Sequence, residues 1–179
     1  MKPFRYVKAD DIECRVATVS EKGCSLLLYK DARCDMKILD ETVGPENWQR
    51  SHELINGNLF CNVSIYDDDK EMWISKQDVG TESYTEKEKG QASDSFKRAC
   101  FNWGIGRELY TAPFIWIKSG DVTLQLQQKN GKFTTYDKFR VEQIIVESGV
   151  IVALAIRNDS LKKRVFLYDV RKNVGKDKI

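Results

Sequence analysis

Asparagine-glycine pairs are the sequence feature that most constrains the fold of this chain. Asn56-Gly57 separates Trp48–Ile55 from Asn58–Tyr66, and such a pair is typical of the two-residue type I′ turn between antiparallel strands. The acidic turn Asp67-Asp68-Asp69-Lys70 then leads into Met72–Lys76. Together these segments predict a three-stranded antiparallel β-meander.

Helical patterns lie on both sides of the predicted meander. Asp31 is a suitable N-cap for a helix that ends at Gly44-Pro45 and whose apolar stripe is formed by Ala32, Met36, Leu39 and Val43. A second helix is predicted from a capping box at Thr85-Glu86-Lys87-Glu88 to Gly104. Its apolar face carries Ala92, Phe96, Ala99, Cys100 and Trp103.

The remaining chain is strand-like at its C-terminal end and ambiguous at its start. Alternation at Val122, Leu124 and Leu126 precedes a second pair, Asn130-Gly131. Further strands are predicted at Phe139–Val146, Val150–Ile156 and Arg164–Tyr168, with a turn at Ser148-Gly149. In residues 1–28 the apolar residues Ile12, Val16 and Val19 have roughly helical spacing and end at Gly23.

The expected fold class is therefore α+β. A three-stranded antiparallel β-meander packed on a central helix would form a β-β-β-α core, and a β-rich C-terminal extension would follow it. We expect the core at 1–114 and the extension, with its basic tail, at 115–179.

Composition limits the classes of protein that fit. The 179 residues are 41% hydrophobic, which excludes wholesale disorder, and the formal net charge is only +2. Any nucleic-acid site must therefore draw on local positive charge, such as the tail from Arg157 to Lys178 with eight Lys/Arg and three Asp. Five cysteines without C-x-x-C spacing, one histidine and no apolar leader predict free thiols in a cytoplasmic protein without a zinc site or a membrane anchor.

Basic residues on the two predicted helices are the remaining candidates for chemistry. Lys97 and Arg98 are adjacent beside the apolar stripe of the second helix, and Arg33 and Lys37 are four residues apart on the first. Arg107 follows the Gly104-Ile105-Gly106 break and is a looser candidate. Such cations bind phosphates without reading bases, although solvated helix flanks would give the same pattern.

Five short motifs occur in order along the expected core, each on its predicted element. They are Tyr29-x-Asp31-Ala32-Arg33, Leu39-Asp40-Glu41-x-x-Gly44-x-x-x-Trp48, Gln77-Asp78-Val79-Gly80, Ser95-Phe96-Lys97-Arg98-Ala99 and Trp103-Gly104. With these motifs, residues 29–113 resemble the Rad-fifty-two (Rad-fifty-two/Rad-twenty-two) family of single-strand DNA annealing proteins, in its short bacterial and phage form.

The resemblance implies a recombinase without enzymatic activity or a cofactor. It would anneal single-stranded DNA without ATP during homologous recombination and DNA repair, as a ring or helical homo-oligomer in a bacterial or phage-infected cell. It assigns the DNA groove to Lys97 and Arg98, with Arg33 as the nearest counterpart of a basic residue on the first helix and Lys37 as a weaker one. The family's third basic residue falls at Phe101. A single-strand-binding protein or an exonuclease is a candidate partner.

Two alternatives remain at this stage. Asp67, Asp68 and Asp78 could serve a metal-dependent nuclease, although acidic residues in a hairpin turn commonly bond to the backbone of the turn itself. The β-rich extension could instead bind a protein partner. Strand cleavage that requires magnesium would identify the nuclease, and a small monomer in light scattering would identify the interaction module.

Overall fold

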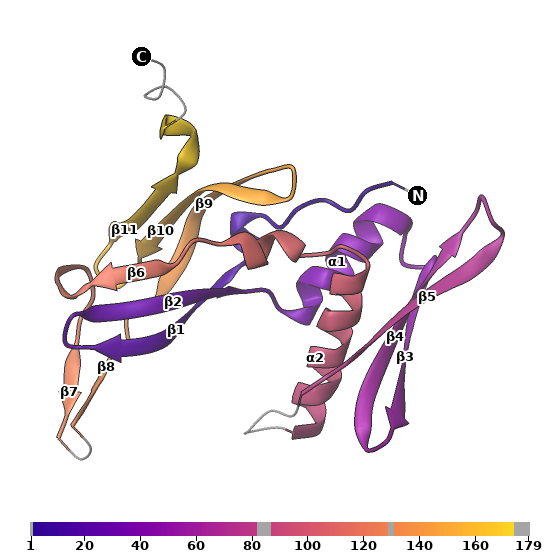
Figure 1. The fold of residues 1–179 in the computed structure, drawn as a ribbon, viewed down its shortest axis with the longest axis horizontal. Coiled ribbons are helices and arrows are strands. Elements are labelled where there is room, and N and C mark those ends of the chain that lie inside the picture. The colour runs from indigo at the N-terminus through magenta and orange to yellow at the C-terminus, as the bar shows by residue number, and fades with distance from the viewer. Residues whose placement is uncertain (1, 82–86, 129–130, 174–179) are drawn as a thin grey trace. The chain divides into compact units, whose positions relative to one another are not determined.

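The computed structural model describes residues 2–81, 87–128 and 131–173 (Figure 1). The expected cap residues Thr85 and Glu86, Asn130 of the second turn pair and the end of the basic tail lie outside the described residues. Residues 2–6 and 30–107 form one compact unit, and residues 7–29 and 108–173 form a second. The single division expected after residue 114 differs from this arrangement, in which each unit is built from two segments.

The predicted α+β class is wrong, because the chain is mostly β. The described residues form eleven strands and two α-helices. The largest sheet has six antiparallel strands in the order β11-β10-β9-β1-β2-β6, and it curls into a nearly closed, barrel-like shape. This sheet joins residues 13–29 to the C-terminal part of the chain. A three-stranded meander on a central helix with a C-terminal extension therefore does not describe the fold.

The second unit contains the six-stranded sheet. Its strands are β1 (Glu13–Ser20), β2 (Gly23–Tyr29), β6 (Ile115–Lys118), β9 (Phe139–Glu147), β10 (Val150–Asn158) and β11 (Lys163–Asp169). A separate hairpin pairs β7 (Gln125–Gln127) with β8 (Lys132–Thr134). Apolar side chains that point into the sheet's interior are buried and form the core of this unit, including Leu26, Ile115, Ile117, Val141 and Ile156.

The first unit contains both helices and the sheet β3-β4-β5. Its elements are α1 (Ala32–Val43), β3 (Trp48–Ile55), β4 (Asn58–Asp67), β5 (Met72–Val79) and α2 (Lys87–Asn102). Helix α2 lies against one face of the sheet (Figure 1). Ile38, Leu39, Val63, Ile65 and Phe96 are completely or almost completely buried in this unit. Among the described helices, none has the length and apolar content that a membrane crossing requires.

The ends of α1 were predicted correctly, but its buried face was not. Asp31 caps the helix, since its Oδ1 accepts a hydrogen bond of 2.9 Å from the Cys34 backbone nitrogen. Gly44 ends it at φ 86°. Of the predicted stripe only Leu39 is buried, and the buried face consists of Cys34, Asp35, Ile38 and Leu39.

The turn between β3 and β4 has the predicted type I′ character. Asn56 and Gly57 have φ values of 52° and 80°. A Cβ atom on Gly57 would meet nothing within 4 Å, so an alanine there is strained only in its backbone. Gly57→Ala should lower the free energy of unfolding by about 1 kcal/mol in urea denaturation. Gly120→Ala is the control, because Gly120 has equal space without a positive φ; an equal loss in both variants would contradict the prediction.

Candidate nucleic-acid interface

The exposed side of α2 carries the predicted pair Lys97 and Arg98. Phe96, Ala99 and Cys100 are fully buried on the opposite side, whereas Lys97 is half-buried and Arg98 is exposed. Since successive helix residues are about 100° apart, the two cations occupy neighbouring positions at the edge of the outward stripe. We call this surface, formed by Lys97, Arg98, Phe101 and the adjoining Arg107, the α2 stripe.

Arg98 is held in position by the sheet. Its Nε atom lies 3.3 Å from Oδ1 of Asp78 on β5, and 48% of the side chain remains exposed. The Asn102 amide donates to Oδ2 of the same carboxylate at 3.3 Å and to the Gln77 carbonyl at 2.9 Å. Asp78 therefore orients the guanidinium while leaving much of it accessible to an anion.

Lys97 belongs to a cluster of charges between the two helices. Asp35 on α1 is fully buried and accepts a hydrogen bond from Lys30 Nζ. Burial raises the pKa of Asp35 to about 6, and the positive charges of Lys30 and Lys97 act in the opposite direction. The Lys97 ammonium is thus close enough to Asp35 to influence its protonation, which places Lys97 on the α1 side of the stripe.

Arg107 joins the stripe from beyond the end of the helix. It donates to the carbonyl of Phe101 at 2.8 Å and to that of Asn102 at 2.9 Å, so its positive charge caps the C-terminal end of α2. Its guanidinium carbon also lies 5.4 Å from the centroid of the Phe101 ring. Arg107 thereby brings positive charge to Phe101, where the family resemblance implied a basic residue.

Arg33 and Lys37 do not join the α2 stripe. Arg33 is 89% exposed and pairs with Asp31 at 2.8 Å, and Lys37 lies 4.0 Å from Glu41. Each is two residues from Asp35, a rotation of about 200° around the helix, so they face away from the side that Asp35 turns toward Lys97. The structure thus brings Lys97, Arg98 and Arg107 together and leaves the α1 pair on a different face.

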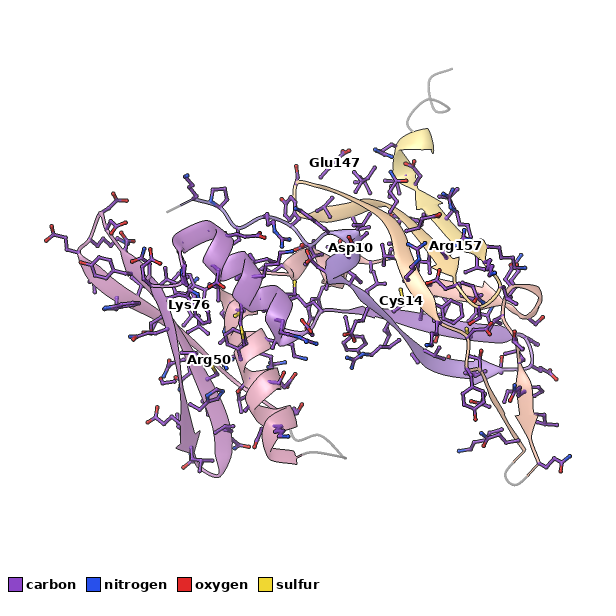
Figure 2. All side chains as sticks on the ribbon, turned by 180° about the vertical axis from the view of Figure 1, so that it is seen from behind. Asp10, Cys14, Arg50, Lys76, Glu147 and Arg157 are labelled. Atoms are coloured by element: carbon purple, nitrogen blue, oxygen red, sulfur yellow. The ribbon has the colours of Figure 1, made fainter. Side chains whose placement is uncertain are left out.

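Two further cations reach α2 from the sheet and were missed in the sequence. Arg50 on β3 lies with its guanidinium carbon 4.7 Å from the Phe96 ring centroid. Lys76 on β5 donates to the Asn102 carbonyl at 2.9 Å and lies 4.7 Å from the Trp103 ring centroid. Both are labelled in Figure 2. Period-two alternation along β3 and β5 could have placed them on the face toward the helix.

The acidic residues considered for metal catalysis have local partners. Asp67 Oδ1 accepts from the backbone nitrogens of Asp69 and Lys70 at 3.1 and 3.2 Å, which is the bonding of an acidic turn. Asp78 is engaged by Arg98 and Asn102 as described above. Within the described residues, no group of three or more His, Cys, Asp or Glu side chains is placed to hold a metal ion.

The cysteines are free thiols with raised pKa values. Burial raises the pKa of Cys61 to about 11, and burial together with the charge of Asp137 does the same for Cys24. Burial alone raises that of Cys14, labelled in Figure 2, to about 12. Since the thiolate is the reactive form, these side chains are poor nucleophiles at neutral pH.

Comparisons with protein-family models, with curated proteins and with solved structures found no match for this chain. The assignment of the interface therefore rests on the contacts of its own residues and on the resemblance of residues 29–113 described above. Of these contacts, the cationic α2 stripe is the arrangement with the clearest chemical use, because it presents three positive charges and one aromatic ring along a single helix edge.

Proposed function

We propose that this protein binds single-stranded DNA and anneals complementary strands without ATP, acting as a homo-oligomer in recombination and repair. The observation that carries the proposal is the α2 stripe. Lys97, Arg98 and Arg107 offer donors to phosphate oxygens, and Asp78 and the end of the helix fix the two arginines in orientation.

Contacts of this kind favour annealing over base reading. Cations that hold the backbone leave the bases of a strand free to pair, and the interaction does not depend on sequence. Phe101, half-buried beneath Arg107, adds a ring against which a base can stack. The charge per chain is small, so repetition of the stripe in an oligomer would be needed to build a long track. The five ordered motifs support the same proposal.

The test is the annealing of complementary labelled oligonucleotides in EDTA. The wild-type protein should accelerate pairing, and Lys97→Ala/Arg98→Ala should weaken strand binding on the order of 10-fold or more. The double variant should also reduce the slope of log affinity against log salt by about 1.4, because it loses two phosphate contacts. Light scattering of the wild-type protein should give a mass well above that of one chain.

Two controls separate phosphate binding from general charge and from folding. Lys70→Ala removes an exposed cation from the β4–β5 turn of the same unit and should leave annealing unchanged. Lys97→Arg/Arg98→Lys keeps both charges and should keep most of the binding. Undiminished annealing by the double alanine variant, a monomeric wild-type protein, or strand cleavage that requires magnesium would each contradict the proposal.

A further inference from the structure

The second unit has an aromatic face that its own core does not use. In the pairing of β2 with β6, Leu26 lies opposite Ile115 and Ser25 lies opposite Trp116. Leu26 and Ile115 are buried in the sheet's interior. Because strand side chains alternate, Trp116 and its neighbours Phe114 and Lys118 project from the outer side.

Two aromatic groups stand on this outer side. The rings of Phe114 and Trp116 are stacked, with centroids 6.3 Å apart and an interplanar angle of 16°, and Phe114 is 78% exposed. On the other side of β2, Tyr29 lies beneath the Arg15 guanidinium, whose carbon is 4.7 Å from the ring centroid. Leu27, opposite Arg15 on β1, is also exposed. We call these residues, Arg15, Leu27, Tyr29, Phe114, Trp116 and Lys118, the aromatic face.

The composition of the aromatic face favours nucleic acid over a protein surface. A protein interface of similar exposure would be expected to be aliphatic at its centre and depleted in charge. Here flat rings alternate with cations, since Arg15 and Lys118 are both exposed beside them. Glu13 pairs with Arg15 at 2.8 Å and fixes its guanidinium over Tyr29. Stacked rings flanked by positive charges are the features by which proteins hold unpaired bases and their phosphates.

We infer that the aromatic face is a second binding surface for single-stranded nucleic acid, which stacks bases on Phe114, Trp116 and Tyr29 and holds phosphates with Arg15 and Lys118. This inference rests on the proposed function for its class of ligand, but it uses residues of the other unit and another mode of contact. The α2 stripe grips the backbone, whereas the aromatic face grips the bases and tolerates any sequence.

The experiment compares two probes that differ only in their bases. One is a thirty-residue oligothymidine, and the other is an abasic deoxyribose-phosphate oligomer of the same length. Phe114→Ala should weaken binding of the oligothymidine by about 5- to 150-fold and leave binding of the abasic oligomer unchanged. Since the Phe114 side chain is mostly exposed, its removal should not affect folding, and an unchanged melting temperature checks this.

Two further variants sharpen the result. Trp116→Phe keeps a ring in place, so it should bind normally while losing the part of the fluorescence quenching that the oligothymidine causes in the wild type. Tyr136→Ala removes an equally exposed aromatic side chain from the loop between β8 and β9, and should bind both probes as the wild type does.

The outcomes separate this inference from the proposed function. If the wild type binds neither probe, both fail. If the wild type binds oligothymidine and Phe114→Ala binds it equally tightly, the aromatic face is overturned while the α2 stripe stands. A Phe114→Ala variant that loses oligomer mass but keeps its preference for bases would also overturn the inference, because the face would then be a contact between copies of the chain.

Discussion

Replacing Lys30 with methionine should lower the free energy of unfolding by about 3–5 kcal/mol at pH 7. The Asp35 carboxylate is fully buried, and Lys30, itself 9% exposed, is its hydrogen-bonded counterion. Its second oxygen, Oδ2, has no hydrogen-bond partner in the described part of the chain. Without Lys30 the buried charge would keep only the influence of Lys97. Methionine is suitable because its unbranched chain can follow the lysine stem past Gly106, where even an added Cβ would come within 2.2 Å of Lys30 Cε.

The deficit of Lys30→Met should depend on pH. Burial raises the pKa of Asp35 from 3.8 to about 6 in the wild type, so the folded protein keeps this proton to a higher pH than the unfolded chain does. The contribution of Asp35 to stability is therefore fully present below about pH 4 and is lost as the pH rises through about 6. Loss of the Lys30 charge raises the pKa further, and the deficit should shrink at pH 5 and grow at pH 7.

Urea denaturation at the two pH values measures this, with Lys30→Met/Asp35→Asn as the matched control. The double variant removes both charges, so it should recover much of the lost stability, and its difference from Lys30→Met should narrow at acid pH. A Lys30→Met protein that stays within about 1 kcal/mol of the wild type at pH 7 would contradict the prediction, as would a deficit that is independent of pH.

Local signals in the sequence were reliable where the structure is local. The meander strands β3 and β4 begin where they were predicted, because the Asn56-Gly57 turn fixes their register. Ser148 and Gly149, with φ values of 51° and 81°, form the expected turn between β9 and β10. In each case two adjacent residues determine the geometry, and no distant partner is needed.

The first strands escaped prediction because a bulge breaks their pattern. The pairing of β1 with β2 shifts register between Val16 and Thr18, so the alternation expected of a strand is lost there. Ile12, Val16 and Val19 consequently have helix-like spacing. The six-stranded sheet also depends on pairing between Glu13 and Arg140, which are 127 positions apart. Local periodicity carries no information on such distant pairs, so the fold class was missed.

The site was predicted in its residues but not in its contacts. Lys97 and Arg98 were identified from their position beside an apolar stripe, which burial of Phe96 and Ala99 supports. The grip of Asp78 on Arg98 and the capping role of Arg107 depend on the packing of α2 on the sheet and on the path of the chain beyond it. Asp35 was not considered, because a carboxylate on a helix is ordinarily exposed and its burial requires the lysines that surround it.

Phe96→Ala should destabilise the first unit by about 3–5 kcal/mol, since it removes the largest fully buried side chain of α2. The ring stacks on Trp48 with centroids 6.1 Å apart and carries the Arg50 guanidinium on its face, so its loss empties the contact between the helix and β3. Urea denaturation followed by tryptophan fluorescence measures the effect. Phe101→Ala, on the half-buried edge of the same helix, is the control and should cost about 1–2 kcal/mol.

Phe96→Leu separates the packing of α2 from its role in strand binding. Leucine keeps most of the buried apolar volume, so the loss should fall to about 1–2 kcal/mol and the helix should stay in place. Because Lys97 and Arg98 are then still presented, this variant should bind single-stranded DNA as the wild type does at temperatures where it is folded. Lys97→Ala/Arg98→Ala should do the reverse and lose binding without a comparable loss of stability. Equal stability of Phe96→Ala and Phe101→Ala, or a binding defect in folded Phe96→Leu, would show that Phe96 does not act by holding α2 on the sheet.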